Sequence, residues 1–305
     1  MISEEYRAQV DLLLTVLPHI EREEIFALHG GTAINLFVLD MPRLSVDIDL
    51  TYLPIEDNRD AALRNISSAL NRIEERLRKS IRGISVTRVP DGQDVKLNCQ
   101  TARATVKVEV NTVIRGTLFP VQEMTVSEVV QNEFGKFAAM RMVAQPQLYG
   151  GKICAALDRQ HPRDLFDVHL LMDRKAITEE IKQGFMISLL SHARPMHELL
   201  RPNFLDNRKS FDAQFAGMSE VEFAYEQYEA TREGLVKAIH DGFADADKKF
   251  LLSFMQGEPE WDLFPLKDLK LLPAVRWKMQ NIQELKGKNL KKHGEMVRAL
   301  EGVLG

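Results

Sequence analysis

Two aspartates separated by a single residue give this sequence its clearest chemical signal. Asp47 and Asp49 lie in the run Ser45–Tyr52, where apolar and polar residues alternate and so predict a β-strand. Residues i and i+2 of a strand point to the same face, so the two carboxylates project side by side. Adjacent carboxylates repel each other unless a cation lies between them, and such hard oxygen ligands suit Mg²⁺, or Mn²⁺ as an alternative. The pair therefore predicts a divalent-metal site.

A third carboxylate belongs to another alternating run. Between Val106 and Asn111 three valines alternate with polar residues, which puts Glu109 on the polar face of a second predicted strand. On a neighbouring strand, Glu109 could be a third metal ligand. A solvated polar strand face is the alternative explanation for both runs. Aspartate is disfavoured in strands, however, so two in close succession call for a compensating reason.

A pair of glycines precedes these aspartates. Gly30, Gly31 and Thr32 stand between a predicted helix and a short apolar helix at residues 33–39. Glycine lets the backbone approach a ligand closely, and the N-terminus of the next helix offers amides and a positive dipole end to phosphate. Thr32 could cap that helix or bond a phosphate oxygen. Gly-Gly-Thr by itself is more often only a turn, but its position before Asp47 favours a phosphate site beside a metal site.

Two further polar residues stand immediately before the aspartates. Ser45 shares their strand face, and Arg43 shares it too if the strand extends that far back. Both are candidates for binding a nucleotide. For Arg43, an ion pair with Asp47 is an equally good explanation.

A second group of charged residues lies farther along the chain. Lys152 is expected to begin a helix after Gly150-Gly151, and Pro162 suits the first turn of the following helix. In that helix Asp164 and Asp167 are three residues apart and share one flank. Lys152 could hold a β- or γ-phosphate, and Asp167 could position or deprotonate an acceptor hydroxyl. An ion-pair network at a corner between helices is the simpler alternative.

The elements that must position these residues can be predicted from periodicity. Residues 4–28 are mostly good helix formers, with Pro18 expected to end the apolar repeat, and residues 59–80 predict a surface helix. Three shorter segments predict antiparallel strands, at residues 84–89, 95–100 and 105–114. After Pro120 almost every segment predicts helix.

These elements divide the chain into two predicted domains. Residues 1–125 predict an α+β domain, a mixed sheet with flanking helices that carries the catalytic carboxylates. Residues 126–305 predict a helical domain that completes the active-site cleft. Within it, Trp261 and Trp277 are expected to anchor the core.

Bulk composition limits the class of protein. The 305 residues are 45% hydrophobic and 28% charged, as in ordinary globular proteins. The net charge of −4 argues against a protein that coats nucleic acid without specificity, because such binding depends on neutralising phosphates. It permits a local basic face, and two basic runs are candidates for one: Arg72, Arg76, Arg78, Lys79 and Arg82, and then Lys286, Lys288, Lys291 and Lys292.

The sequence also indicates a compartment. Its two cysteines, Cys99 and Cys154, are too few for a disulfide framework. No apolar run approaches the roughly 20 residues that span a bilayer, and the acidic N-terminus lacks the order of a signal peptide. We therefore expect a cytoplasmic protein without a membrane partner.

Taken together, these motifs resemble a known group of enzymes. Gly30-Gly31-Thr32 followed by Arg43-x-Ser45-x-Asp47-x-Asp49 resembles the glycine turn and paired aspartates of the nucleotidyltransferase fold. Lys152-x-x-Ala155-x-x-x-Arg159 followed by Arg163-Asp164-x-x-Asp167 is similar to the AbiEii/AbiGii toxin family, which contains toxins of bacterial toxin–antitoxin and phage-abortive systems. The resemblance covers roughly residues 28–172.

The resemblance implies transfer of a nucleotide from a nucleoside triphosphate (NTP), with Mg²⁺ held by Asp47 and Asp49. By the motif, Lys152 would bind phosphate and Asp167 would be the distal catalytic carboxylate. Glu109 matches the superfamily's third carboxylate, on which this toxin family does not always depend. Some members use the 3′ end of tRNA as acceptor, and a cognate antitoxin is implied as a partner. Transfer to a small molecule and a non-catalytic nucleotide-binding module are the alternatives.

Overall fold

The computed structural model divides the chain into two compact units. The first comprises Met1–Ala144 together with Gly217–Glu222, and the second comprises Gln145–Ala216 together with Phe223–Gly305. The structure describes residues 4–56, 58–91, 94–174, 176–215, 217–219 and 221–305. Among these residues, no helix is both long and apolar enough to cross a membrane.

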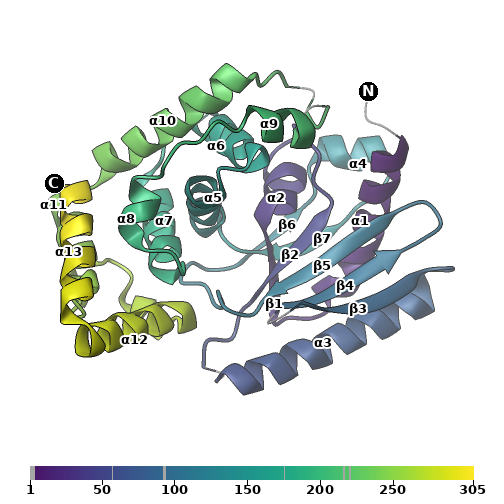
Figure 1. Cartoon of the computed structure of the whole chain (residues 1–305). Helices are drawn as coiled ribbons and strands as arrows, with labels where there is room; N and C mark the ends of the chain where they lie inside the picture. Colours follow the sequence, from purple (N-terminus) through teal and green to yellow (C-terminus); the bar gives the residue numbers. More distant parts are fainter. Residues whose placement is uncertain (1–3, 57, 92–93, 175, 216, 220) are drawn as a thin grey trace. The chain divides into compact units, whose positions relative to one another are not determined.

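A seven-stranded mixed sheet organises the first unit (Figure 1). The strand order is β3-β4-β5-β2-β1-β7-β6, in which β2 pairs parallel with β5 and antiparallel with β1. The strands are β1 (Phe26–His29), β2 (Asp47–Tyr52), β3 (Ser85–Asp91), β4 (Asp94–Gln100), β5 (Thr105–Asn111), β6 (Gln122–Thr125) and β7 (Ala139–Met142). The mixed sheet with helices confirms the predicted α+β class.

Alternation along the strands builds the core of this unit. Ile48, Leu50 and Val108 are fully buried, as the apolar positions of the predicted strands require. Helices α1 (Glu4–Glu21) and α3 (Arg59–Ser80) contact several of the strands. Helix α3 begins where the Asn58 side chain accepts a hydrogen bond from the Ala61 N–H, and its apolar stripe is buried: Ala62, Ile66, Ala69, Leu70, Ile73 and Leu77. The first unit also holds α4 (Glu128–Phe134).

Three short strands differ from the sequence prediction. Helix α1 continues through Pro18 to Glu21, and residues 26–29, expected to be helical, form β1 between β2 and β7. β6 and β7 lie in a region that was expected to be helical after Pro120. A run of four residues is too short for its periodicity to distinguish a strand from a helix. Its conformation is therefore decided by pairing with the neighbouring strands. Because β6 and β7 belong to the sheet, the unit boundary at Ala144 lies later than the expected one at residue 125.

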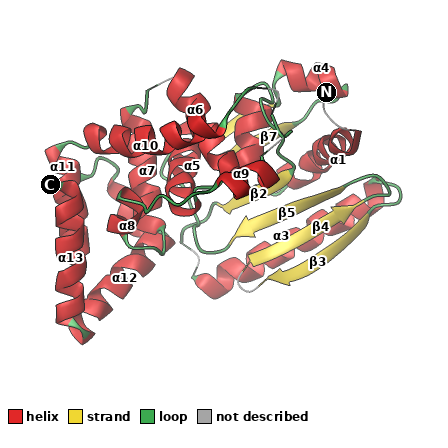
Figure 2. Ribbon diagram, turned by 45° about the horizontal axis from the view of Figure 1, so that its top comes forward, coloured by secondary structure: helices red, strands yellow, loops and turns green. Residues whose placement is uncertain are grey.

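The second unit is helical throughout its described residues (Figure 2), as predicted. Its α-helices are α5 (Gln145–Arg159), α6 (Pro162–Arg174), α7 (Glu179–Ser191), α8 (Met196–Leu200), α9 (Arg208–Gln214), α10 (Tyr225–Gly242), α11 (Asp245–Met255), α12 (Pro273–Lys288) and α13 (Leu290–Leu304). Two short 3-10 helices, η2 (Trp261–Leu263) and η3 (Lys267–Leu271), lie between α11 and α12.

Two predictions for this unit were wrong. Lys152 does not begin a helix, because α5 starts at Gln145 and includes Gly150-Gly151 in its interior. A β-carbon on Gly150 would lie 2.1 Å from the carbonyl carbon of Gly184 in α7, so glycine there serves close helix packing and not a turn. Trp277 is 60% exposed and does not anchor the core, whereas Trp261 packs with Phe250 and Phe254.

Candidate active site

The two aspartates open β2 in the way the sequence predicts. Asp47 and Asp49 are partly exposed, while Ile48 between them is fully buried. The carboxylates therefore occupy the same face of the strand, opposite the side chains that enter the core. Arg43 and Ser45 precede β2, and both are buried.

The paired glycines lie directly against these residues. Gly30 has φ +79°, and a β-carbon on it would be 2.3 Å from Asp49 Oδ2. A β-carbon on Gly31 would be 2.8 Å from Arg43 Nη2 and 2.9 Å from Ser45 Oγ. Any side chain at either position would displace the polar groups. The structure thus brings the glycine turn, Arg43, Ser45 and Asp49 together, as proposed from sequence spacing.

Helix α2 (Gly30–Thr32) continues directly into the π-helix η1 (Ala33–Val38), which corresponds to the predicted short apolar helix. The Thr32 side chain is fully buried and does not cap the π-helix that follows it. Its Oγ1 donates a hydrogen bond to the Asp47 carbonyl at 2.5 Å and lies 3.1 Å from Ser45 Oγ. Thr32 therefore ties the glycine turn to the start of β2.

A tyrosine that the sequence analysis missed supports this arrangement. The Ser45 N–H donates a hydrogen bond to the Tyr6 hydroxyl oxygen, and the Tyr6 side chain is buried. Burial raises the pKa of Tyr6 above its ordinary value, so its hydroxyl stays neutral. Tyr6 lies in α1, outside every motif that marked the site. No local pattern identifies it, because the contact joins residues 39 positions apart.

A row of polar side chains crosses four strands at Asp49. In register, Asp49 is opposite His29 of β1 on one side and Glu109 of β5 on the other, and Glu109 is opposite Lys96 of β4. Glu109 Oε1 is 3.3 Å from Lys96 Nζ. His29 Nδ1 is 3.2 Å from Thr51 Oγ1. The predicted third carboxylate is therefore beside Asp49 but already has a cationic partner.

The chemistry of this donor set fits Mg²⁺ at the two aspartates. Mg²⁺ in NTP-dependent enzymes is bound by one or two carboxylates plus substrate phosphates, and it keeps several waters. Asp47 and Asp49 supply two partly exposed carboxylates beside a backbone turn with no side chains to obstruct a phosphate. Among the described residues, no three His, Cys, Asp or Glu side chains form a ready metal cage. Metal binding by Asp47, Asp49 and Glu109 stays a prediction.

In the helical unit, Lys152 forms ion pairs with two acids. Its Nζ is 2.7 Å from Asp164 Oδ1 and 3.1 Å from Asp167 Oδ2. All three side chains are at least nine-tenths buried, and Asp167 has no exposed surface. Helix α5 supplies the lysine and α6 supplies both acids. Asp164 and Asp167 therefore lie on the same flank of α6, as the sequence predicts.

Asp164 is the residue whose importance the sequence analysis understated. Arg159 Nε donates to its Oδ2 at 2.5 Å, and Lys152 binds its other oxygen. Burial alone would raise the pKa of Asp164, but the two cations outweigh burial and hold that pKa well below its usual range. The Arg163-Asp164-x-x-Asp167 motif contains this signal, because Asp164 is its first aspartate.

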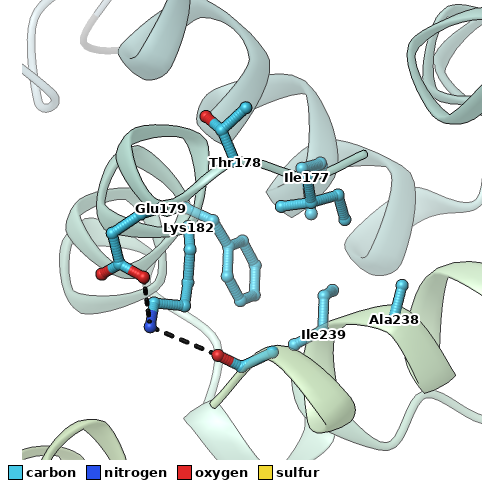
Figure 3. Close-up of a pocket in the computed structure, with 9 residues that line it drawn as sticks. Ile177, Thr178, Glu179, Lys182, Ala238 and Ile239 are labelled. Carbon is cyan, nitrogen blue, oxygen red and sulfur yellow. Dashed lines mark hydrogen bonds and ion pairs between the residues drawn. The ribbon is translucent and has the colours of Figure 1, made fainter. Parts of the chain in front are cut away.

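A small cavity elsewhere in the helical unit is unsuited to a nucleotide (Figure 3). Its volume is about 60 Å³, far below the roughly 300 Å³ at which ligand pockets begin. Beside it Lys182 Nζ is 2.9 Å from Glu179 Oε2 and 2.6 Å from Asp247 Oδ2, and it donates to the Gly242 carbonyl at 3.2 Å. Lys182 is thus a second buried lysine with two acidic partners.

Comparisons with known proteins identify the family and the fold. The family model described as "Nucleotidyl transferase AbiEii toxin, Type IV TA system" matches residues 11–281. Among solved structures, MenT4, a nucleotidyltransferase toxin from Mycobacterium tuberculosis H37Rv, has a similar fold with a TM-score of 0.61 at 14% identity. That match covers 99% of this chain and 96% of MenT4. No curated protein sequence matches.

The family match spans most of the chain and includes the glycine turn, both aspartates, Lys152 and Asp167. It removes the alternative of a nucleotide-binding module without catalysis, and it implies an NTP as substrate and a cognate antitoxin. This protein belongs to the AbiEii family of nucleotidyltransferase toxins.

Proposed function

We propose that this enzyme transfers a nucleoside monophosphate from an NTP to RNA, with the 3′ end of tRNA as the acceptor, in a reaction that depends on Mg²⁺. The observation that carries the proposal is the contact between the glycine turn and Asp49, which leaves backbone exposed beside a carboxylate pair. The proposal assigns the enzyme to the cytoplasm, where tRNA is found.

In the proposed reaction, the acceptor hydroxyl attacks the α-phosphorus of the NTP and pyrophosphate leaves. Mg²⁺ bound by Asp47 and Asp49 would lower the pKa of the acceptor hydroxyl and neutralise charge on the α-phosphate. The residues of the first unit supply the remaining contacts. The amides of Gly31 and Thr32, in the first helical turn, have no acceptor within the helix and suit phosphate oxygens. Arg43 and Ser45, beside Gly31, are assigned to the same phosphates.

The helical unit supplies Lys152 and Asp167. An ammonium group has three N–H donors; Lys152 donates one to Asp164 and forms an ion pair with Asp167. A further N–H of Lys152 suits a phosphate oxygen of the departing pyrophosphate. Asp167 is assigned to orient the acceptor hydroxyl, with Lys152 holding its carboxylate in place. Asp164 and Arg159 position Lys152 and need not touch the substrate.

The direct test incubates the purified enzyme with labelled NTPs, Mg²⁺ and total RNA. We expect label in RNA of tRNA size, and none after chelation of the metal. Asp49→Ala should remain folded by circular dichroism and lose at least 100-fold of the transfer rate. Asp60→Ala, which removes an exposed acid from α3, is the matched control and should keep wild-type activity.

Other outcomes decide against parts of the proposal. Label in small metabolites and not in RNA would favour the alternative acceptor class, as in enzymes that modify antibiotics. If folded Asp49→Ala enzyme still incorporates label in the presence of Mg²⁺, the assignment of the metal site to Asp49 is wrong. Undiminished transfer after chelation would show that the reaction does not require a metal ion.

A further inference from the structure

Positive charge is concentrated at the C-terminal end of the second unit. Residues 264–305 contain nine Lys or Arg and four Asp or Glu, an excess of five positive charges in a chain whose net charge is −4. This segment comprises η3, α12 and α13. Helix α12 contacts both η3 and α13, and Figure 2 shows α12 and α13 side by side. Such local charge is an electrostatic footprint for a polyanion.

Most of these cations have no acidic partner among the residues that the structure describes. Lys278 is nevertheless already engaged, because its Nζ donates to the carbonyls of Leu189, His192 and Arg194 at 2.7–3.1 Å. Two other lysines form exposed ion pairs with Glu258 and Glu284. Six exposed cations form no ion pair with any residue in the described ranges: Lys267, Lys270, Arg276, Lys291, Lys292 and Arg298.

Three of the five cations in the other basic run are used in internal contacts. Arg72 and Arg76 both bind Glu23, at 2.5 and 2.6 Å, and Arg78 binds Glu74 and the Val86 carbonyl. These guanidinium groups tie α3 to the turn after α1 and to β3, which leaves less charge for an external anion. Of the two candidate basic faces, the C-terminal one has the greater share of available cations.

An exposed aromatic ring lies on the same segment. Trp277 is 60% exposed on α12, and Gln280 and Asn281, one helical turn later, are exposed on the same side. Arg276 is its exposed neighbour. Single-stranded nucleic acid is bound by such combinations, in which cations track the phosphates, aromatic rings stack on bases, and amides can bond base edges.

We propose that η3, α12 and α13 bind the RNA acceptor, with an unpaired base stacked on Trp277 and phosphates bound by Arg276 and the unpaired lysines. This inference rests on the proposed RNA acceptor. RNA is favoured over a protein partner because, among the described residues of this segment, the six exposed cations without an ion pair outnumber the three such acids, Asp268, Glu295 and Glu301, and because Trp277 is flanked by exposed amides.

The test measures binding of fluorescently labelled tRNA by anisotropy, from about 50 to 200 mM KCl. We expect Trp277→Ala to weaken binding about tenfold, as loss of one base–aromatic stack does, and Trp277→Phe to restore most of it. Reversal of charge in Lys291→Glu/Lys292→Glu should make the salt dependence weaker. The magnitude of the slope of log affinity against log salt should fall by about two, because two phosphate contacts are lost. Lys79→Glu/Arg82→Glu, on exposed positions of the other basic run, is the control and should change little.

The outcomes separate this inference from the proposed function. Wild-type affinity and salt dependence in Trp277→Ala and in the Lys291/Lys292 double variant would overturn the binding surface, even if the enzyme labels RNA. Conversely, an enzyme that labels no RNA yet binds it through Trp277 would lose the proposed reaction and keep the surface. Because Trp277 is exposed, its substitution should leave the circular dichroism spectrum unchanged.

Discussion

Gly30 lies against Asp49 so closely that no other residue could stand in its place: a β-carbon there would be 2.3 Å from Oδ2 of the aspartate. Its φ of +79° also lies in the left-handed region that only glycine adopts without strain. The glycine turn and the carboxylate pair are therefore a single structure. This relationship explains how a turn and a strand separated by a helix can serve one substrate.

Gly30→Ala should therefore abolish transfer by displacing the Asp49 carboxylate. We expect a fall of at least 100-fold in kcat/KM and a loss of about 1–3 kcal/mol of stability from strain. Gly83→Ala is the matched control, because Gly83 has φ +75° but nothing within 4 Å of an added β-carbon. Gly83→Ala should lose a similar amount of stability from backbone strain and keep its activity. Equal activities in the two variants would contradict the role given to the Gly30–Asp49 contact.

Tyr6→Phe tests the hydrogen bonds behind the site. Removal of the hydroxyl leaves the buried Ser45 N–H without its acceptor, which should cost about 1–3 kcal/mol of stability. Because Ser45 and Thr32 are linked to Asp47, we also expect kcat to fall about tenfold with little change in the KM for NTP. Tyr228→Phe removes another buried tyrosine hydroxyl, which donates to the Gln160 carbonyl at 2.7 Å. That control should lose stability and retain kcat.

Two buried lysines allow catalysis to be separated from folding. Lys152 and Lys182 are each 8% exposed, and each pairs with two acids in the helical unit. Lys152→Met and Lys182→Met should each lose about 3 kcal/mol, because removal of the cation leaves a buried carboxylate uncompensated. Only Lys152→Met should lose transfer in protein shown to be folded. Comparable losses of activity per folded molecule would assign Lys152 to structure alone.

Asp164 should make stability depend on pH on the acid side. The Lys152 and Arg159 cations hold the pKa of Asp164 below its unfolded value of about 3.9, despite burial. The unfolded state then binds more protons at acidic pH, so this carboxylate stabilises the fold above about pH 4 and loses that contribution as pH falls further. Urea unfolding should show Asp164→Asn about 3 kcal/mol less stable than wild type at pH 7. The difference should shrink below pH 4, and a constant difference would refute the pairing.

Adjacent glycines in α5 should respond in opposite ways. Gly150→Ala would place a β-carbon 2.1 Å from the Gly184 carbonyl carbon and should separate α5 from α7, at a cost of about 3 kcal/mol or more. Gly151→Ala meets only Ser188 Oγ at 3.9 Å and should stabilise the helix by up to about 1 kcal/mol. Thermal unfolding of both variants would check this, and destabilisation by both would show that Gly151 also has a packing role.

Much of the fold could be predicted from local periodicity. Strand β2 with its two aspartates, the long amphipathic helix α3 and the pair α5–α6 carry repeats of 2.0 or 3.6 residues over enough length to be recognised. Strand β1 could not be predicted, because Phe26–His29 has only four residues, three of them apolar, and its conformation depends on β2 and β7 beside it.

The sequence by itself determined the chemical types at the site: two carboxylates on one strand face, a glycine turn before them, and a lysine before an Arg-Asp-x-x-Asp motif. Covalent order and backbone geometry are sufficient for these, since neighbours on a strand or helix are set by residue spacing. Only the tertiary structure decided that Tyr6 binds Ser45, that Lys152 binds both Asp164 and Asp167, and that Trp277 faces solvent. These depend on which distant elements pack together, and side-chain spacing along the chain does not encode that information locally.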